Sequence, residues 1–518
     1  MMSRRVRPDE WVPTGVDTLE RNAEDAVRDM VSTLVVAGPG AGKTELLAQR
    51  ASYLLETRLC PPPRSILAIS FKRDAAKNLR ERVKQRCGSS AARRFHSYTF
   101  DAFAKGLVDR FRMALPDALR PSSDYVIDFA LTRGAQLRDR LTSLAGNETG
   151  VSLGRLQEYD ARKFFDSMVV GRELSSALAP DADEASRVSW AFWQSALHGG
   201  AKSALNFQML GTLAELLLRS NPMILHALRG TYTFVFLDEF QDTTGIQYRL
   251  LHTAFHGSEA VLTAVGDHKQ RIMLWAGALE GVFDVFRREF NAELRGLEMN
   301  YRSAPRLVQI QRYLVESLDP RSAMPRAVER GNGEEGECRL LVFPDNEIEA
   351  DSLATLINTW INEEGVAPNE ICVLVRKLAD RFSAPLRAAL AKRGIASRVE
   401  DELQDLLTEP VMLLACAFVR LASQPRHAAS WTFVMDVLLD ARGLSGNEQN
   451  ATRLSRELAE FINDVRQTIA ANPEAAQLTQ LIHDIIAYLD EPTFRRMYPQ
   501  YAQARLSSAY DRSMFASA

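Results

Sequence analysis

The chain alternates short apolar runs with longer stretches in which apolar residues recur at helical spacing, a pattern typical of an α/β protein. Two runs are clearest: residues 31–37 read Val-Ser-Thr-Leu-Val-Val-Ala, and residues 232–237 read Tyr-Thr-Phe-Val-Phe-Leu. Their β-branched and aromatic residues and short length predict strands buried on both faces of a parallel sheet. Because ligands bind at the carboxyl ends of such strands, the residues after each run are the first candidates for a functional site.

The first run continues into a glycine-rich loop that ends in a lysine and a threonine. Its residues are Ala37, Gly38, Pro39, Gly40, Ala41, Gly42, Lys43 and Thr44. The glycines allow backbone N–H groups to surround phosphates, and a helix that begins at Lys43 would direct its N-terminal dipole at the same charge. Lys43 would contact the β- and γ-phosphates of ATP, and Thr44 would ligate Mg²⁺. A strict phosphate loop has glycine at the position of Ala37. The alternative interpretation of the segment is a flexible glycine turn that binds no ligand.

The second run ends in an acidic pair, Asp238 and Glu239. At the carboxyl end of a strand, Asp238 is placed to hold Mg²⁺ and Glu239 to orient and deprotonate an attacking water. A solvated acidic turn is the alternative, but the apolar strand before the pair directs both carboxylates to one edge of the sheet. The phosphate loop and the acidic pair together predict nucleotide hydrolysis.

Composition narrows the class of protein. With 518 residues and 46% hydrophobic content the chain can form several cores, and its five cysteines lack the spacing of a zinc site, an iron–sulfur cluster or a disulfide framework. We therefore expect a cytoplasmic protein, and the lack of an apolar run of about 18 residues argues against a membrane partner. The net charge of -3 neither indicates nor excludes nucleic acid. Residues 64–94, however, hold ten Lys/Arg against Asp74 and Glu81, which favours a phosphate-contacting surface over a merely solvated helix face.

Five further segments occur in a characteristic order. They are 66–83, 99–103 (Thr-Phe-Asp-Ala-Phe), 238–247 (beginning Asp-Glu-Phe-Gln-Asp-Thr), 265–278 and 300–303 (Asn-Tyr-Arg-Ser). With the phosphate loop, this series resembles motifs Ia, Ib, II, III and IV of superfamily 1A DNA helicases, the UvrD, PcrA and Rep group. The resemblance implies an α/β fold with two RecA-like P-loop NTPase domains, parallel sheets flanked by helices, and helical insertions.

The resemblance also implies roles for the matched residues. Gln270 would sense the γ-phosphate, Tyr301 would stack on adenine, and Arg302 would act as an arginine finger from the second domain. With Lys43 and Glu239, Gln270 and Arg302 complete the expected catalytic set. The residues expected to contact DNA are Phe71, Lys72, Thr99, Phe100, Trp275 and Arg376. Phe71 and Trp275 would stack on single-stranded bases.

The chain departs from the family pattern at three places. The glutamine that reads adenine before the phosphate loop is absent, with Asn22 the only carboxamide nearby. Ala276 replaces the arginine that follows the motif III tryptophan, and motifs V and VI do not occur after Arg302. We therefore expect an incomplete second RecA-like domain. We also expect the chain alone to bind ATP, hydrolyse it slowly and displace no strand unless a second polypeptide supplies the missing segment.

The order of the motifs predicts the domain organisation. We expect domain 1A at 1–105 and 208–302, a helical insertion 1B at 106–207, the first part of domain 2A at 303–425, and part of a helical insertion 2B at 426–518. Within domain 2A, alternating patterns predict strands at 339–343 and 371–375 and helices at 349–362 and 380–393.

The sequence thus predicts an ATP- and Mg²⁺-dependent motor that binds single-stranded or partly duplex DNA and moves 3′ to 5′, in repair, recombination or anti-phage defence. The polarity rests on the resemblance alone. A first alternative, which Ala276 favours, is a DNA-binding ATPase that does not unwind and serves as a sensor beside a protein partner such as a nuclease. A second is a P-loop small-molecule kinase, which the Asp-Glu-Phe-Gln-Asp and Tyr-Arg segments oppose.

Overall fold

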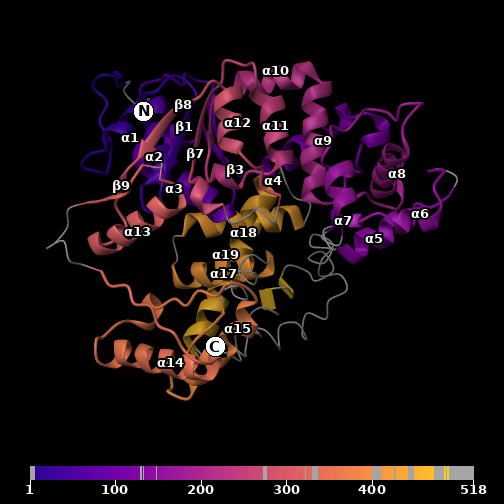
Figure 1. Ribbon diagram of the computed structural model, residues 1–518. Coiled ribbons are helices and arrows are strands. Elements are labelled where there is room, and N and C mark those ends of the chain that lie inside the picture. The colour runs from indigo at the N-terminus through magenta and orange to yellow at the C-terminus, as the bar shows by residue number, and fades with distance from the viewer. Residues whose placement is uncertain are drawn as a thin grey trace. The chain divides into compact units, whose positions relative to one another are not determined.

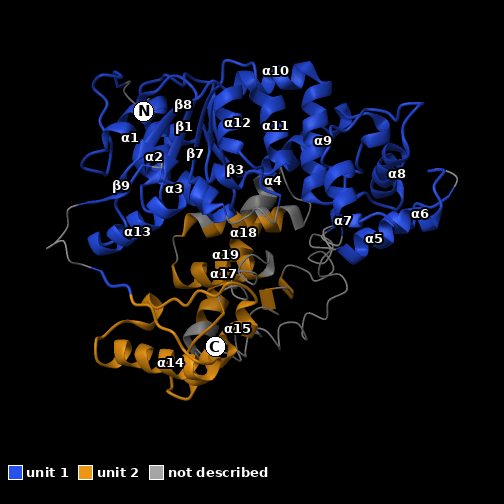
Figure 2. Cartoon of the chain, in the orientation of Figure 1, with its two compact units in different colours: residues 1–338 blue, residues 339–518 orange. Residues whose placement is uncertain are grey.

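The computed structural model divides into two compact units, residues 1–338 and 339–518 (Figure 2). It describes residues 6–128, 131, 134–146, 149–271, 277–320, 323–328, 336–399, 410–424, 427–441, 448–471, 484–485 and 487–488. Both the phosphate loop and the acidic pair belong to unit 1.

Unit 1 is built around a six-stranded sheet in which every neighbouring pair of strands is parallel (Figure 1). The strand order is β3-β2-β6-β7-β1-β8. The bounds are β1 (Thr33–Ala37), β2 (Ser65–Ser70), β3 (Phe95–Thr99), β6 (Tyr232–Leu237), β7 (Val261–Gly266) and β8 (Glu293–Leu297). Both strands predicted from apolar runs are confirmed, although β1 begins at Thr33 rather than at residue 31.

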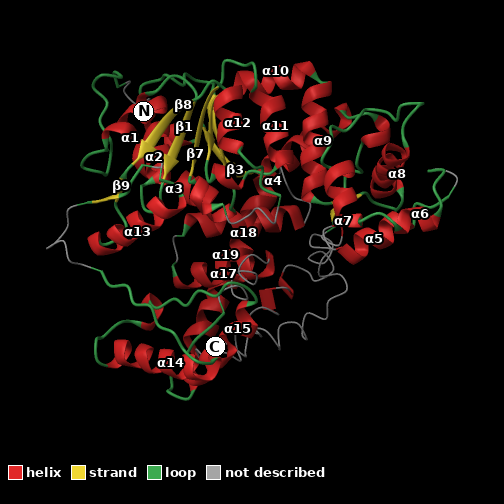
Figure 3. Cartoon of the chain, viewed as in Figure 1, coloured by secondary structure: helices red, strands yellow, loops and turns green. Residues whose placement is uncertain are grey.

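Helices cover both faces of this sheet (Figure 3). One face packs against α1 (Arg21–Arg28), α2 (Lys43–Glu56) and α3 (Arg73–Ala92). The other packs against α4 (Phe100–Phe111), α9 (Phe207–Ser220), α11 (Gly245–Phe255) and α12 (Val282–Glu289), while α10 (Pro222–Thr231) leads into β6. Val35 and Phe236 are buried with the first group of helices, and Leu34 and Val235 with the second. This alternation explains why β1 and β6 are apolar at nearly every position.

The segment between α4 and α9 is mainly helical, in keeping with the expected insertion. It contains η1 (Arg112–Ala114), η2 (Asp117–Leu119), α5 (Gly134–Thr142), α6 (Leu153–Gln157), α7 (Ala161–Phe164), the π-helix η4 (Phe165–Val169) and α8 (Glu184–His198). Two short strands, β4 (Val126–Ile127) and β5 (Ala204–Leu205), pair in parallel within it. Arg249 on α11 donates to the carbonyls of Val170 and Gly171, both at 2.6 Å, which fixes the insertion on the helices that cover the sheet.

Unit 1 continues beyond the expected domain boundary at residue 302. After β8 come β9 (Met299–Asn300), α13 (Pro305–Leu318) and β10 (Arg326–Ala327), and β10 pairs with β9. Two single-turn helices, η5 (Phe240–Asp242) and η6 (His268–Gln270), follow β6 and β7. Because β9 and α13 are part of unit 1, Arg302 lies in the same compact unit as the phosphate loop.

The regular elements in the described part of unit 2 are all helices. Its elements are α14 (Asn346–Asn362), η8 (Pro368–Glu370), α15 (Ala379–Ala391), α17 (Pro410–Ser423), α18 (Ala428–Ala441) and α19 (Glu448–Ala471). The two predicted helices are confirmed as α14 and α15, but the predicted strands at 339–343 and 371–375 are wrong, since both segments are irregular. A strand requires a neighbour to pair with its backbone, and the described part of unit 2 offers none. Leu340, Val342 and Leu374 are accordingly 91%, 85% and 90% exposed.

Across the described residues of both units, the structure contains no helix with the length and apolar character needed to cross a bilayer.

Candidate functional site

The glycine-rich loop joins β1 to α2 at the carboxyl edge of the sheet. Gly40 and Gly42 have φ angles of 76° and 80°, in the left-handed region that favours glycine. Helix α2 begins at Lys43, as predicted, and Gly42 has no side chain with which to cap it. No side chain at position 42 therefore caps the first N–H groups of α2. Uncapped N–H groups at a helix N-terminus can bind phosphate.

The acidic pair follows β6 and faces the loop. Glu239 has a φ of 49°, which is unusual for a residue with a side chain. Its Oε2 accepts hydrogen bonds from Lys43 Nζ and from Gln241 Nε2, both at 2.8 Å. The carboxylate thus supplies an anionic oxygen to Lys43, as a phosphate oxygen would. Such a pairing is expected when the lysine of a nucleotide-binding loop has no phosphate to contact.

Asp238 is buried at the end of β6, where its N–H donates to the carbonyl of Ile69 at 2.9 Å. Burial raises the pKa of Asp238 to about 6, the neighbouring Glu239 carboxylate adds to this, and Lys43 opposes it. Two further buried oxygens at this edge, Ser70 Oγ on β2 and Asp242 Oδ1 on η5, have no hydrogen-bond partner. Mg²⁺ prefers oxygen ligands, and a bound cation would offset the negative charge that burial makes unfavourable on Asp238. These oxygens therefore fit a Mg²⁺ ion.

A network that the sequence did not predict joins the acidic pair to the segment after β7. Gln241 is buried, and its Oε1 accepts the N–H of Asp267 at 3.0 Å. The same oxygen would lie only 2.4 Å from a Cβ at Gly266, so a side chain at this position would displace the Gln241 carboxamide. Asp267 in turn accepts a hydrogen bond from Gln270 Nε2 at 2.9 Å. Gln241 therefore connects Glu239 to the proposed γ-phosphate sensor, Gln270.

The turn that carries Tyr301 and Arg302 packs on the phosphate loop. The N–H of Tyr301 donates to the carbonyl of Gly40 at 2.9 Å, and the tyrosine remains 38% exposed, as a base-stacking ring requires. Glu20, not singled out from the sequence, accepts the N–H groups of Glu298 and Met299 at 3.1 and 2.8 Å and so fixes the chain before this turn.

Asn22, the only carboxamide near the position of the absent glutamine, forms a hydrogen bond to the sheet. Asn22 donates to the carbonyl of Gly296 at 2.7 Å, and so joins α1 to β8. Its side-chain nitrogen therefore supports the edge of the sheet beside β1.

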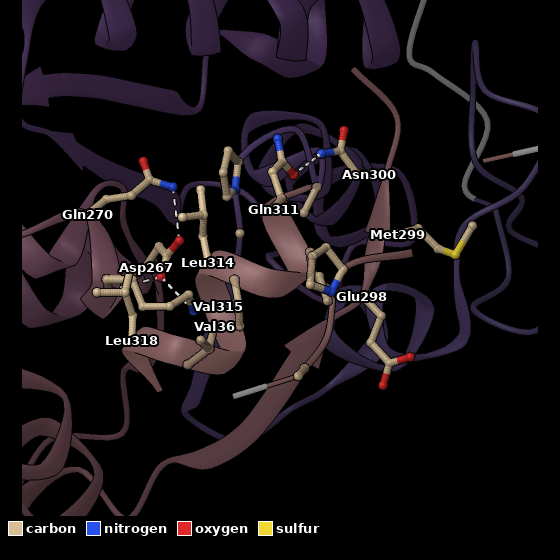
Figure 4. Close-up of a pocket in the computed structure, with 17 residues that line it drawn as sticks. Val36, Asp267, Gln270, Glu298, Met299, Asn300, Gln311, Leu314, Val315 and Leu318 are labelled. Atoms are coloured by element: carbon tan, nitrogen blue, oxygen red, sulfur yellow. Dashed lines mark hydrogen bonds and ion pairs between the residues drawn. The ribbon is translucent and has the colours of Figure 1, made fainter. Parts of the chain in front are cut away.

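A cavity of about 190 Å³ lies between the phosphate loop and α13 (Figure 4). Its walls are mostly apolar, with Leu314, Val315 and Leu318 on the side of α13. Polar side chains lie at its margin, among them Asp267, Gln270, Asn300 and Gln311.

The candidate DNA-contact residues fall into different environments. Phe71 follows β2, is half-buried, and belongs to neither core cluster of the sheet, while Lys72 beside it is exposed. Thr99 caps α4 by accepting the N–H of Ala102 at 3.1 Å. Phe100 is 7% exposed within the core, and its contact with DNA stays a prediction.

The two remaining DNA candidates are Trp275 and Arg376. Trp275, like Ala276, lies outside the described residues. Arg376 is exposed in unit 2, which is separate from the unit that holds Phe71 and Lys72.

Only part of the basic segment 64–94 is available to a ligand. Arg82 and Arg86 bind Glu45 of α2 at 2.8–3.0 Å, which joins α3 to the helix of the phosphate loop. Arg80 and Arg94 donate to backbone carbonyls. The exposed cations at the start of α3 are Lys72, Arg73 and Lys77.

The comparisons with known proteins agree with this geometry. Residues 19–291 match the family described as UvrD/REP helicase N-terminal domain. The chain is 27% identical to DNA helicase II of Escherichia coli (strain K12) over 510 residues, which cover 90% of this chain and 67% of that protein. It is 25% identical to the ATP-dependent DNA helicase PcrA of Leuconostoc citreum over 461 residues (86% and 58%). It is 28% identical to the ATP-dependent DNA helicase Rep of Escherichia coli (strain K12) over 284 residues (54% and 41%).

Proposed function

This chain belongs to the UvrD/REP helicase family, and from that membership we propose that unit 1 is an ATP-hydrolysing motor that moves 3′ to 5′ along single-stranded DNA. One observation carries the proposal. Lys43, Asp238 and Glu239 converge at the carboxyl ends of β1 and β6, and the turn of Tyr301 and Arg302 is hydrogen-bonded to the same phosphate loop.

The residues around the loop divide the chemistry of hydrolysis. Lys43 would bind the β- and γ-phosphates of ATP, which breaks its ion pair with Glu239. Glu239 would then accept a proton from the water that attacks the γ-phosphorus, and ADP and phosphate are the products. Thr44 and Asp238 would hold Mg²⁺, which when bound neutralises charge on the phosphates. Gln270, oriented by Asp267, would contact the γ-phosphate.

Tyr301 and Arg302 would complete the nucleotide site. The exposed ring of Tyr301 offers a stacking face for adenine, and its backbone bond to Gly40 places that ring beside the loop. The Arg302 guanidinium would stabilise negative charge on the transferring phosphate, because its planar donors match phosphate oxygens in pairs.

The DNA track would follow the carboxyl ends of β2 and β3. Phe71 would stack on a base, and Lys72, Arg73 and Lys77 would contact phosphates. Glu45, which binds Arg82 and Arg86, joins the helix of the phosphate loop to α3, the helix that begins at this surface. Its position supports a motor in which nucleotide binding affects the grip on DNA.

ATP hydrolysis with and without single-stranded oligodeoxythymidylate tests the proposal. We expect stimulation by DNA in the unaltered chain and loss of hydrolysis in Lys43→Ala. DNA affinity should be largely kept, because the Lys43 side chain is only 12% exposed and is paired with Glu239. Lys163→Ala, at a side chain 86% exposed on the insertion, is the matched control and should hydrolyse normally. Hydrolysis that DNA does not stimulate would refute the assignment as a DNA motor and favour the small-molecule kinase.

Strand displacement then separates the two DNA-dependent functions. Because the proposed movement is 3′ to 5′, any displacement should favour a substrate with a 3′ single-stranded tail over one with a 5′ tail. DNA-stimulated hydrolysis without displacement of either substrate would instead support the ATPase that does not unwind, the function that Ala276 favours from the sequence.

A further inference from the structure

Asn300 lies at the centre of the turn that holds Tyr301 and Arg302. It is 2% exposed, and its Oδ1 accepts the N–H groups of Arg302 and Ser303, both at 2.9 Å. Its Nδ2 donates to Gln311 Oε1 on α13 at 2.9 Å (Figure 4). Gln311 Nε2 also donates to Ser303 Oγ at 3.3 Å. Gln311 on α13 therefore contacts this turn through both the oxygen and the nitrogen of its amide.

These bonds determine which way the Asn300 amide points. Two backbone N–H donors require an oxygen on one side of the amide, and the oxygen of Gln311 requires a nitrogen on the other. Without Gln311, Nδ2 would keep only its longer bond to Ser303 Oγ at 3.4 Å, and a buried amide that loses its better partner is costly. The acceptor on Gln311 thus stabilises the one Asn300 orientation that folds the turn around Arg302.

The turn is also in close contact with the phosphate loop. A Cβ at Gly40 would lie 2.3 Å from Asn300 Oδ1 and 2.9 Å from the Cβ of Arg302. The backbone bond from Tyr301 to Gly40 adds a second connection. A displacement of Asn300 therefore moves the base of Arg302 relative to the loop, and catalytic groups tolerate only small errors of position.

We propose that Gln311 is a positioning residue for ATP hydrolysis, which acts through Asn300 to hold Arg302 against the phosphate loop. The proposal rests on the function proposed above for Arg302. Gln311 lies outside residues 19–291, the part of the chain that matches the family. None of the motifs that the sequence resembles includes it.

The surroundings of Gln311 separate positioning from simple packing. The neighbouring cavity is lined on α13 by Leu314, Val315 and Leu318, so a leucine at position 311 meets apolar neighbours. Gln311→Leu should consequently fold, while it removes both hydrogen bonds to the turn. Gln309→Leu on the same helix is the matched control, because Gln309 is exposed.

Steady-state kinetics of the full chain test the proposal. We expect Gln311→Leu to lower kcat about tenfold or more with a KM for ATP within about threefold of the unaltered value, because Tyr301 keeps its own bond to Gly40. ADP affinity should not change, since ADP lacks the γ-phosphate. In an Arg302→Ala background the added Gln311→Leu change should lower kcat no further. A further loss in that background, or a normal kcat in the single variant, would overturn the proposal.

Hydrogen exchange gives a readout that does not need hydrolysis. In the absence of nucleotide, the amides of Arg302 and Ser303 should exchange faster in Gln311→Leu than in the unaltered chain or in Gln309→Leu. Unchanged exchange at both amides would also overturn the proposal. If the unaltered chain hydrolysed no ATP, the proposed function would fail, and exchange alone would decide whether Gln311 holds the turn.

Discussion

Asp238→Asn should make the protein more stable while it removes magnesium-dependent hydrolysis. Asp238 is buried beside Glu239, and its pKa is raised from 3.8 to about 6. The folded protein therefore binds a proton more tightly at this site than the unfolded chain does. Stability falls as pH rises through the window between these two values, and above pH 6 the full cost of the ionised carboxylate is present.

The magnitude follows from the two pKa values. At 1.36 kcal/mol per pKa unit, the ionised carboxylate lowers the free energy of unfolding by about 3 kcal/mol at pH 8, and by about half as much at pH 5. Asparagine cannot ionise. Its Oδ1 can still accept the N–H of Glu239, a bond of 3.1 Å in the structure. We therefore expect Asp238→Asn to gain up to about 3 kcal/mol at pH 8 and clearly less at pH 5.

Urea unfolding in EDTA at the two pH values measures this difference. Tryptophan fluorescence is a suitable signal, since Trp11 and Trp193 are buried in unit 1. Asp139→Asn, at an exposed position on α5, is the matched control and should differ little from the unaltered chain at either pH. Added MgCl₂ should stabilise the unaltered chain at pH 8 but not Asp238→Asn, because the variant lacks the anionic ligand.

The pH dependence decides the outcome. A variant less stable than the unaltered chain at pH 8, or a gain that is equal at pH 5 and pH 8, would show that burial does not oppose the charge of Asp238. The assignment of this edge as a cation site would then lose its physical basis.

Other substitutions test the remaining contacts of the site. Glu239→Gln should bind ATP but not hydrolyse it, measured by nucleotide binding and single-turnover assays, and hydrolysis at the unaltered rate would contradict its role as the base. Phe71→Ala should weaken single-stranded DNA binding by about 1–3 kcal/mol with little change in melting temperature, whereas a large loss of stability at normal affinity would return Phe71 to the core. Gly40→Ala should raise the KM for ATP and lower kcat, because the added Cβ would lie 2.3 Å from Asn300 Oδ1. Gly38→Ala, which has no heavy atom within 4 Å of its Cβ, should be tolerated, and equal effects of the two changes would refute the steric argument.

The sequence alone identified the residues whose chemistry depends on neighbours along the chain. The strand–glycine loop–helix order around Lys43 and the apolar run before Asp238 are local patterns, and the structure forms both as predicted. Parallel strands meet at their carboxyl ends, so these two segments could be placed together without coordinates. The family resemblance added Gln270, Tyr301 and Arg302. It placed Arg302 in the second domain, whereas the structure has it in unit 1 with the phosphate loop.

Local sequence patterns could not predict the environment of a residue whose neighbours come from distant segments of the chain. Phe100 lies in a segment that resembles a helicase motif, and only the structure shows that α4 packs it against the helices of unit 1. The segments 339–343 and 371–375 have strand-like composition, but a strand forms only when another pairs with it. Arg82 and Arg86 belong to a basic segment, but Glu45 on α2 binds both.

The sequence by itself therefore determined the class of the protein and suggested most of the residues proposed for catalysis, because glycine loops and apolar strands act over a few positions. Only the tertiary structure decided what holds those residues in place. Gln241 contacts Asp267, Glu20 contacts the backbone of β9, and Gln311 contacts Asn300. Such amide and carboxylate side chains have no periodicity or spacing that marks them, since their effect comes from hydrogen bonds of fixed direction. These bonds form only after the sheet and its helices have brought the partners within about 3 Å.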